Sequence, residues 1–457
     1  MRPLFLPWAK LRSAMTSRRR MGLILVAIVT ILLIALIFVL PAVVNPEHYR
    51  LRVISYLQEK TGKQVEIGRL GVTFFPKVSI RIDDFGVRNP PLFPSGYIVK
   101  VARIDAELDA GALLHRQVAI KSLILEDPIV DLTSDPDGPW NFENPHSNVS
   151  GNSFPLGVIS RVQIKRGQLT ASNLLPSDAA GPIFLEAHEI SSELEQVDLV
   201  AITNPSSSSL DGQGYLKAGR LRFGSIEATG VNSKLRLQAR QVFFTEVRAK
   251  LYGGNATGSL SFKLSGKNAS FKTSARITGI DMDDLLAAFR NARGKLTGRM
   301  EGDLKLEGEM EHSLHPLGGM RGTGHVTVRN GQAPSLKLNA NLMKLAHFND
   351  LGPAKQDPSS FSYISTDLKL ANLRISSSAI DIDGYGVDVD GWGNVSVSGS
   401  DDLNYQGVAK IIAKQGFFTN TFARMSGATL TDGKLSFPFR IGGTIEVPIF
   451  SKGTKTN

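Results

Sequence analysis

The sequence predicts a mainly β protein: an antiparallel meander of many short strands, with one N-terminal transmembrane helix and a few short helices. Three observations support this fold class. The chain contains one long uncharged apolar run near its start. Apolar and polar residues alternate with period two through most of the remaining sequence. Turn sequences rich in Gly, Asn and Asp separate the alternating runs at regular intervals, which is typical of successive hairpins.

The predicted transmembrane helix occupies residues 21–44. The stretch from Met21 to Leu40 has no charged residue and, at the rise of an α-helix, is long enough to cross a hydrocarbon core of about 30 Å. The apolar run continues to Val44 without the small-residue cleavage site of a signal peptide, so we expect a retained anchor. The residues before the run include six basic and no acidic side chains, namely Arg2, Lys10, Arg12, Arg18, Arg19 and Arg20. The positive-inside rule therefore predicts a cytoplasmic tail over residues 1–20 and export of everything after Asn45.

The charge and the absence of cysteine exclude several classes of function. The formal net charge is +10, but six of these charges lie in the basic tail, which leaves +4 for the rest of the chain. We therefore interpret the basic charge as a topology signal and expect no nucleic-acid partner. A chain without cysteine has no disulfides, thiolate metal sites or cysteine nucleophiles.

Few segments carry helical periodicity. Apolar residues recur at helical spacing over residues 46–60, and Gly62 follows where a C-terminal cap belongs, so we expect an amphipathic helix at the membrane surface. Shorter helices are predicted at 281–291 and 338–348, with a further candidate at 411–425.

Alternating runs and their turns define the strands. Val247, Ala249 and Leu251 lead into a Gly-Gly-Asn turn, and a second turn follows at 266–268. The Asp-Gly pairs at 383–384 and 390–391 are likewise interpreted as hairpin turns.

No catalytic or metal-binding motif is present. The P-loop, the G-x-S-x-G elbow and the G-x-G-x-x-G fingerprint are all absent, so we expect a protein that is not an enzyme and has no cofactor. His312 and His315 lack a third ligand, and we predict no metal there. The aspartates at 381, 383, 388 and 390 do not follow the EF-hand order, and their alternation with apolar residues fits the solvent face of a hairpin.

The distributed apolar face is the remaining candidate site. Its candidate inward residues are Val78, Ile80, Ile82, Leu260, Phe262, Leu264, Leu304, Leu306, Phe437, Phe439 and Ile441. Alternation alone fits two arrangements equally well: an open groove, or a β-sandwich whose apolar faces pack on each other.

Several segments resemble the AsmA family. The most specific is TGKQVEIGRLGVTFFPKVSIRIDDFGVRNPP, residues 61–91. It is followed by SLILEDPIVDLTSDPDGPWNFEN, which contains a proline-led strand, a polar turn and a Gly-x-Trp-Asn close at Gly138, Trp140 and Asn141. The segments AKLYGGNATGSLSF, GTGHVTVRNGQ and DGKLSFPFRIGGTIEVP are similar to the family's recurrent and terminal strands.

The resemblance implies an elongated, curved β-sheet groove similar to chorein-type bridge proteins, whose apolar inner face binds phospholipid. It also implies a bacterial inner-membrane protein with its bulk in the periplasm and a role in outer-membrane biogenesis. Its partners would be membrane lipids and an outer-membrane or periplasmic protein. The alternative is a scaffold that regulates protein targeting to the outer membrane and carries no lipid. We divide the exported part into an AsmA N-terminal-like region (45–145), a middle β region (146–275) and a C-terminal AsmA-like region with short helices (276–457).

Overall fold

The computed structural model describes residues 47–115, 117, 119–135, 140–142, 158–174, 180–198, 212–238, 241–263, 269–289, 293–310, 319–334, 336–345, 360–396, 402–412, 428–431, 434–444 and 447–453. The predicted basic tail and transmembrane helix therefore lie outside the described residues. Among the residues that are described, no helix is both long and apolar enough to cross a membrane.

Twenty strands and four helices make up the described part of the chain. The strands are β1 (Val65–Thr73), β2 (Ser79–Arg88), β3 (Tyr97–Leu108), β4 (Ile120–Ser134), β5 (Val158–Leu174), β6 (Ala180–Asp198), β7 (Gly212–Phe223), β8 (Ile226–Gln238), β9 (Gln241–Leu251), β10 (Gly254–Lys263), β11 (Ala269–Asp281), β12 (Arg299–Met310), β13 (Met320–Gln332), β14 (Ser360–Ala371), β15 (Arg374–Gly384), β16 (Val387–Ser396), β17 (Leu403–Ile412), β18 (Thr429–Thr431), β19 (Lys434–Gly443) and β20 (Pro448–Lys452). The helices are α2 (Glu47–Thr61), α3 (Ala110–Leu114), α5 (Met282–Ala287) and α6 (Leu338–Leu345). The predicted mainly β class is confirmed.

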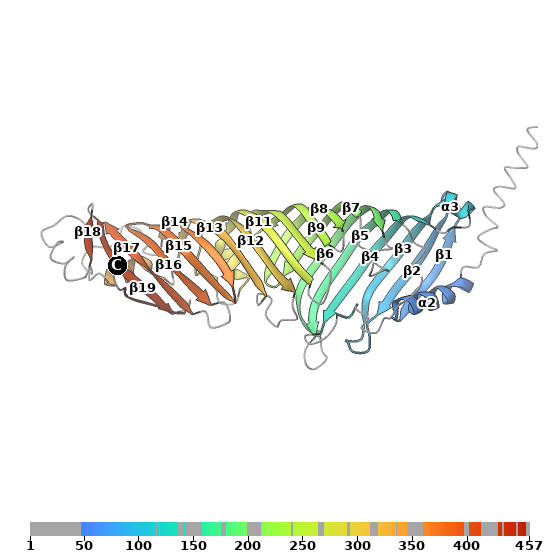
Figure 1. Cartoon of the computed structure of the whole chain (residues 1–457), viewed down its shortest axis with the longest axis horizontal. Helices are drawn as coiled ribbons and strands as arrows, with labels where there is room; N and C mark the ends of the chain where they lie inside the picture. Colours follow the sequence, from blue (N-terminus) through green and yellow to red (C-terminus); the bar gives the residue numbers. More distant parts are fainter. Residues whose placement is uncertain are drawn as a thin grey trace, which may run out of the picture.

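All twenty strands belong to one long, curved sheet (Figure 1). Each strand from β1 to β16 pairs with the next one in the chain. Strand β19 then pairs with β17 on one side and with β18 and β20 on the other. The sheet thus has eighteen inter-strand spacings, which at about 4.8 Å each give a hydrogen-bonded length of about 86 Å. The meander follows from the short turns, because a two-residue hairpin joins only antiparallel neighbours.

One pairing departs from the predicted antiparallel direction. Strands β4 and β5 run parallel, with Leu123 opposite Val162 and Leu132 opposite Ala171. A parallel pair requires a crossover of a dozen or more residues, and 23 residues separate Ser134 from Val158. The Asp, Pro, Asn and Ser content of this segment indicates a loop but carries no information on strand direction, so the sequence did not reveal the parallel pair.

The hairpin predictions have mixed outcomes, and the turn predicted at 266–268 lies outside the described residues. Leu251 lies opposite Gly254 across the predicted turn between β9 and β10. The turn near Asp383 is centred two residues later, at Tyr385 and Gly386. The turn predicted at 390–391 is wrong: these residues lie inside β16, where Gly391 is opposite Gly407 of β17.

The predicted helices at 46–60, 281–291 and 338–348 correspond to α2, α5 and α6, whereas α3 was not predicted. Asp281 caps α5 by accepting hydrogen bonds from the backbone N–H groups of Asp283 and Asp284. The helix proposed at 411–425 is wrong at its start, because Ile411 belongs to β17; residues 413–427 lie outside the described part.

Helix α2 covers the first edge of the sheet. Arg50 Nη1 donates to the carbonyl oxygen of Ile67 at 2.9 Å, and Gln58 Nε2 donates to that of Val65 at 3.4 Å. The backbone N–H of Leu70 donates to Glu47 Oε1 at 3.3 Å. These side chains take the place of a neighbouring strand for three edge groups of β1, which are thereby unavailable for pairing with another chain.

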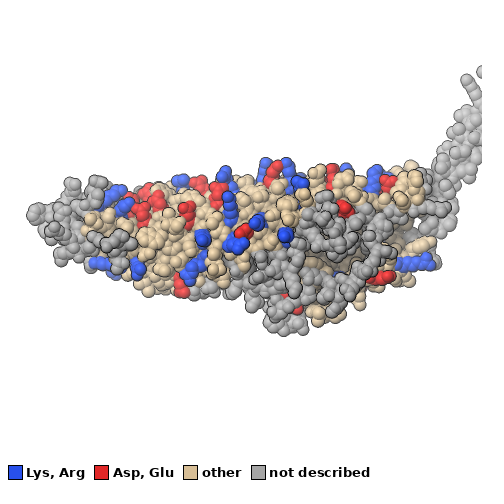
Figure 2. All heavy atoms as spheres, in the orientation of Figure 1, with Lys and Arg blue, Asp and Glu red and all other residues tan. Residues whose placement is uncertain are grey.

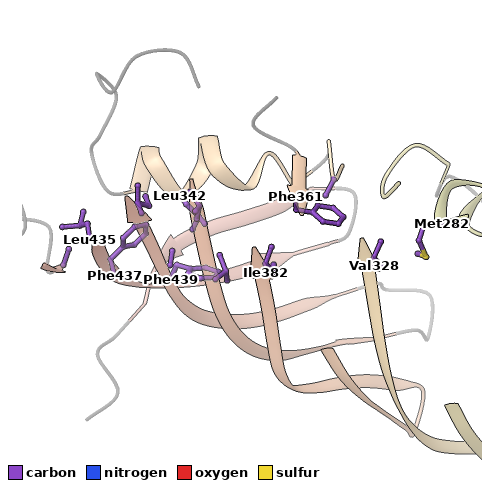
Figure 3. Close-up of a cluster of buried hydrophobic side chains, with 14 residues drawn as sticks. Met282, Val328, Leu342, Phe361, Ile382, Leu435, Phe437 and Phe439 are labelled. Atoms are coloured by element: carbon purple, nitrogen blue, oxygen red, sulfur yellow. The ribbon is translucent and has the colours of Figure 1, made fainter. Parts of the chain in front are cut away.

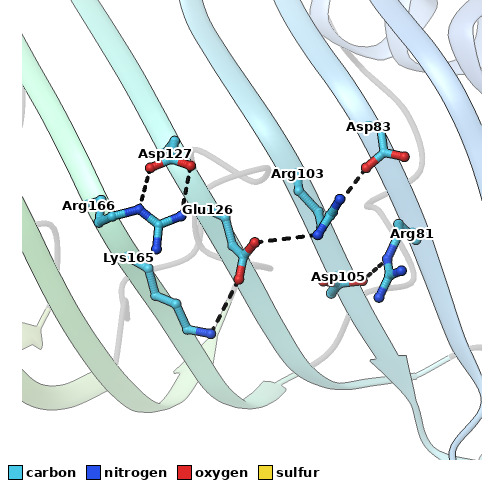
Figure 4. A network of polar contacts seen from close by, with 8 residues as sticks. All are labelled: Arg81, Asp83, Arg103, Asp105, Glu126, Asp127, Lys165 and Arg166. Atoms are coloured by element: carbon cyan, nitrogen blue, oxygen red, sulfur yellow. Dashed lines mark hydrogen bonds and ion pairs between the residues drawn. The ribbon is translucent and has the colours of Figure 1, made fainter.

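Ion pairs between neighbouring strands line one face of the sheet (Figure 4). Arg81 lies 2.7 Å from Asp105, and Glu126 lies between Arg103 and Lys165 at 3.8 and 3.4 Å. Lys, Arg, Asp and Glu side chains are interspersed over the surface seen in Figure 2. The alternation of the strands therefore separates a charged face from an apolar one.

Candidate functional site

A continuous row of directly opposed residues crosses the apolar face, and we call it the central row. Opposite residues of paired strands point to the same side of a sheet, so the register identifies its members. Going from β1 to β17, the central row consists of Val72, Ile80, Ala106, Leu123, Val162, Leu194, Gly214, Leu235, Phe244, Leu260, Thr273, Leu306, Gly322, Leu370, Ile375, Val395 and Leu403. Thr273 is its one member that is neither apolar nor glycine.

An open cavity of about 630 Å³ lies over the middle of the central row. Its lining consists of three-residue stretches from six neighbouring strands, β9 to β14. The middle residues of these stretches are Phe244, Leu260, Thr273, Leu306, Gly322 and Leu370, all in the central row. Because side chains alternate along a strand, these six residues form the floor of the cavity.

Glycines allow the strands to curve tightly around this face. A Cβ at Gly322 would lie 2.3 Å from the carbonyl oxygen of Lys305 and 2.5 Å from Leu306 Cδ2. A Cβ at Gly214 would lie 1.8 Å from the carbonyl oxygen of Glu193. Neighbouring backbones therefore approach the apolar face too closely for any side chain at these two positions, and glycine is required there.

A second row of directly opposed residues crosses the same face and is packed beneath helices. We call it the covered row. Its members are Ile280, Met300, Val328, Ile364, Ile382, Val389, Ala409 and Phe437. Helix α6 lies across these strands (Figure 3), with Leu342 fully buried in a cluster that includes Phe361 and Leu435. Leu285 and Leu286 of α5 pack against the same cluster. In its C-terminal half the apolar face is thus part open groove and part closed core.

The predicted groove residues divide between these two environments. Ile80, Leu260 and Leu306 belong to the central row and are half-buried. Four more are also half-buried, namely Val78, Ile82, Phe262 and Leu304. The ring of Phe262 contacts that of Phe244 edge-on, with centroids 6.2 Å apart.

The C-terminal candidates lie in the closed core. Phe437 and Phe439 are 5% and 3% exposed, and Ile441 packs against the same cluster. These three residues therefore lie in or against the same buried cluster as Leu342 of α6. Leu264 lies outside the described residues.

Four floor residues were missed as candidates, namely Phe244, Thr273, Gly322 and Leu370. In β9 the alternating phase breaks at Glu246, a bulge residue with φ of 51° and a register shift against β10. The bulge places Phe244 on the same face as Val247, although their spacing is odd. The double phenylalanine at 243–244 was the available signal, but period two alone cannot bridge a bulge.

No metal centre accompanies the groove in the described part of the chain, where no three His, Asp or Glu side chains converge. Asp381 lies opposite Asp390, and Asp383 opposite Asp388, on the charged face. Lys410 neutralises Asp390 at 2.6 Å. His312 and His315 fall outside the described residues.

Comparison with known proteins identifies one family. The AsmA family pattern matches residues 15–156, which include α2 and β1 to β4. No curated protein and no solved structure matches the chain. The matched segment contains the TGKQVEIG opening, the first four positions of the central row and the Trp140–Asn141 turn. The match over residues 15–156 is to the AsmA family, the family that the sequence resembles.

Proposed function

We propose that this protein binds the acyl chains of phospholipid along the central row and conveys them away from the membrane that anchors it. The observation that carries the proposal is the unbroken apolar row from β1 to β17, with an open cavity over six of its strands. The proposal includes an inner-membrane anchor, a periplasmic location and a role in outer-membrane biogenesis, as the resemblance implies. It involves no catalysis.

The energetics support this mode of binding. An acyl chain with about sixteen buried methylenes gains on the order of 13 kcal/mol at about 0.8 kcal/mol each. The gain is non-directional, so it needs no specific polar pocket. Neighbouring positions along the central row are chemically similar, and a chain can pass from one to the next at low cost.

Two adjacent residues of β11 provide a matched test. Both residues border the cavity, but side chains alternate along a strand, so Thr273 lies in the floor and the exposed Ser274 side chain lies on the charged face. Thr273→Trp fills the groove, so lipid recovered with the detergent-extracted full-length protein should fall several-fold when measured by mass spectrometry. Ser274→Trp should leave the lipid content unchanged.

A gain-of-signal experiment complements the two variants. A photo-crosslinking amino acid at position 273 should capture lipid, and the same amino acid at position 274 should not. Equal crosslinking at both positions, or wild-type protein that carries no lipid, would contradict the proposal and favour a scaffold that acts only through protein partners.

A further inference from the structure

Helix α2 has two different sides. Its inward side holds the edge of β1 through Glu47, Arg50 and Gln58. The contacts of Glu47 and Gln58 are eleven residues apart in the helix, and their partners Leu70 and Val65 are five residues apart in the strand. Each of these two intervals is about 16.5 Å long. Helix α2 and strand β1 therefore run alongside each other in opposite directions.

The outward side of α2 presents two aromatic side chains with one basic and one acidic side chain, Arg52 and Glu59, to solvent. Tyr49 and Tyr56 are 52% and 41% exposed. Arg52 is also exposed, and its guanidinium group lies 6.0 Å from the centroid of the Tyr49 ring. Tyr49, Arg52 and Tyr56 follow one stripe, because residues three, four and seven apart share a helix face.

We propose that this outward side is a bilayer-docking surface that seats α2 in the headgroup region of the anchoring membrane. Tyrosine and arginine are the side chains suited to this region, since each combines an apolar body with a polar end. The inference rests on the anchoring part of the proposed function and adds the residues that make the contact and the orientation that they impose.

The sequence before α2 identifies the bilayer as the occupant. No charged residue occurs from Met21 to Pro46, and α2 begins at the next residue, Glu47. An anchor that ends within a few residues of a helix keeps that helix at the membrane surface. Docking then lays β1 along the membrane plane, so the central row starts at Val72 beside the lipid and leads away from it.

The absence of cysteine allows a direct test on the full-length protein. The variants Tyr49→Cys and Tyr56→Cys are each labelled with an environment-sensitive fluorophore in nanodiscs of phosphatidylethanolamine and phosphatidylglycerol. Both labels should be quenched by lipids that carry a nitroxide and be several-fold less sensitive to iodide than a label at Thr257→Cys, an exposed position in β10.

The outcomes separate docking from anchoring. If the protein co-elutes with the nanodiscs but iodide quenches all three labels equally, the docking surface is overturned while anchoring and lipid binding stand. If the protein does not co-elute with the nanodiscs, the anchor fails and the docking surface fails with it.

Discussion

Asp127 and Arg166 form a bidentate ion pair across the parallel strands β4 and β5, with distances of 2.6 and 2.8 Å from Nε and Nη2 to the two carboxylate oxygens. Both residues have left-handed backbone conformations, with φ of 51° and 54°. The two strands therefore carry matching irregularities, and the register is the same on either side of them. The ion pair joins the points at which both strands bend.

This pair predicts a pH-dependent contribution to stability. Hydrogen bonds from Arg166 hold the pKa of Asp127 below its usual value of about 3.9. A carboxyl whose pKa is lowered by folding stabilises the protein above the unfolded pKa and loses this effect as the pH falls. Asp127→Asn should lower the thermal midpoint at neutral pH, and the difference from wild type should shrink below about pH 3.9. A difference that stays constant down to pH 2 would show that the charge is not responsible.

We expect Asn141 to stabilise the start of the crossover between β4 and β5. Its side chain is fully buried, and Nδ2 donates to Asn89 Oδ1 at 2.9 Å and to the carbonyl oxygen of Asp131 at 2.8 Å. Asn141→Ala leaves two acceptors without this donor and should lower the free energy of unfolding by about 2 kcal/mol or more in denaturant titrations. Phe142→Ala is the control, since Phe142 is 49% exposed, and an equal loss in both variants would contradict this role.

Charge substitutions distinguish the groove from the closed core. Leu304 is half-buried on the apolar face, opposite Ala275 and Gly324, so an aspartate there reaches water when lipid is absent. Leu304→Asp should fold and lose bound lipid. Phe437→Asp buries a charge beneath α6 and should cost several kcal/mol, enough to prevent folding.

The control for this pair is Lys305→Asp, on the charged face of the same strand. Thermal midpoints and lipid content by mass spectrometry check all three variants. Loss of folding in Leu304→Asp, with Lys305→Asp intact, would place position 304 in a packed core instead.

The backbone at Gly322 leaves no space for a larger side chain in the floor of the groove. Its missing Cβ would meet both the Lys305 carbonyl oxygen and the Leu306 side chain. Gly322→Ala should therefore destabilise the protein by about 1–3 kcal/mol through overpacking, measured as a shift in the denaturant midpoint. In β1, a Cβ at Gly71 would have no neighbour closer than 3.9 Å, so Gly71→Ala should be nearly neutral. Equal midpoints for the two variants would contradict close approach at Gly322.

Local sequence alone determined the strand periods, the hairpin turn between β9 and β10, the positions of the three longer helices and the resemblance to the AsmA family that the match over residues 15–156 supports. These features depend on neighbouring residues: alternation needs only the pleat, and the Asp281 cap needs only the next turn of chain. The same local information identified Leu260, Leu306 and Phe437 as residues of one apolar face.

Only the tertiary structure decided which part of that face is open. Leu306 and Phe437 have the same alternating sequence context, yet Phe437 lies in the cluster closed by α6, whose residues are about a hundred positions earlier in the chain. The parallel direction of β5 and the bulge at Glu246 are also invisible to periodicity. A crossover changes the strand direction without changing the alternation, and a bulge shifts the phase of the alternation. Long-range contacts of this kind depend on which segments pack against each other. An alternating sequence is compatible with many such packing arrangements.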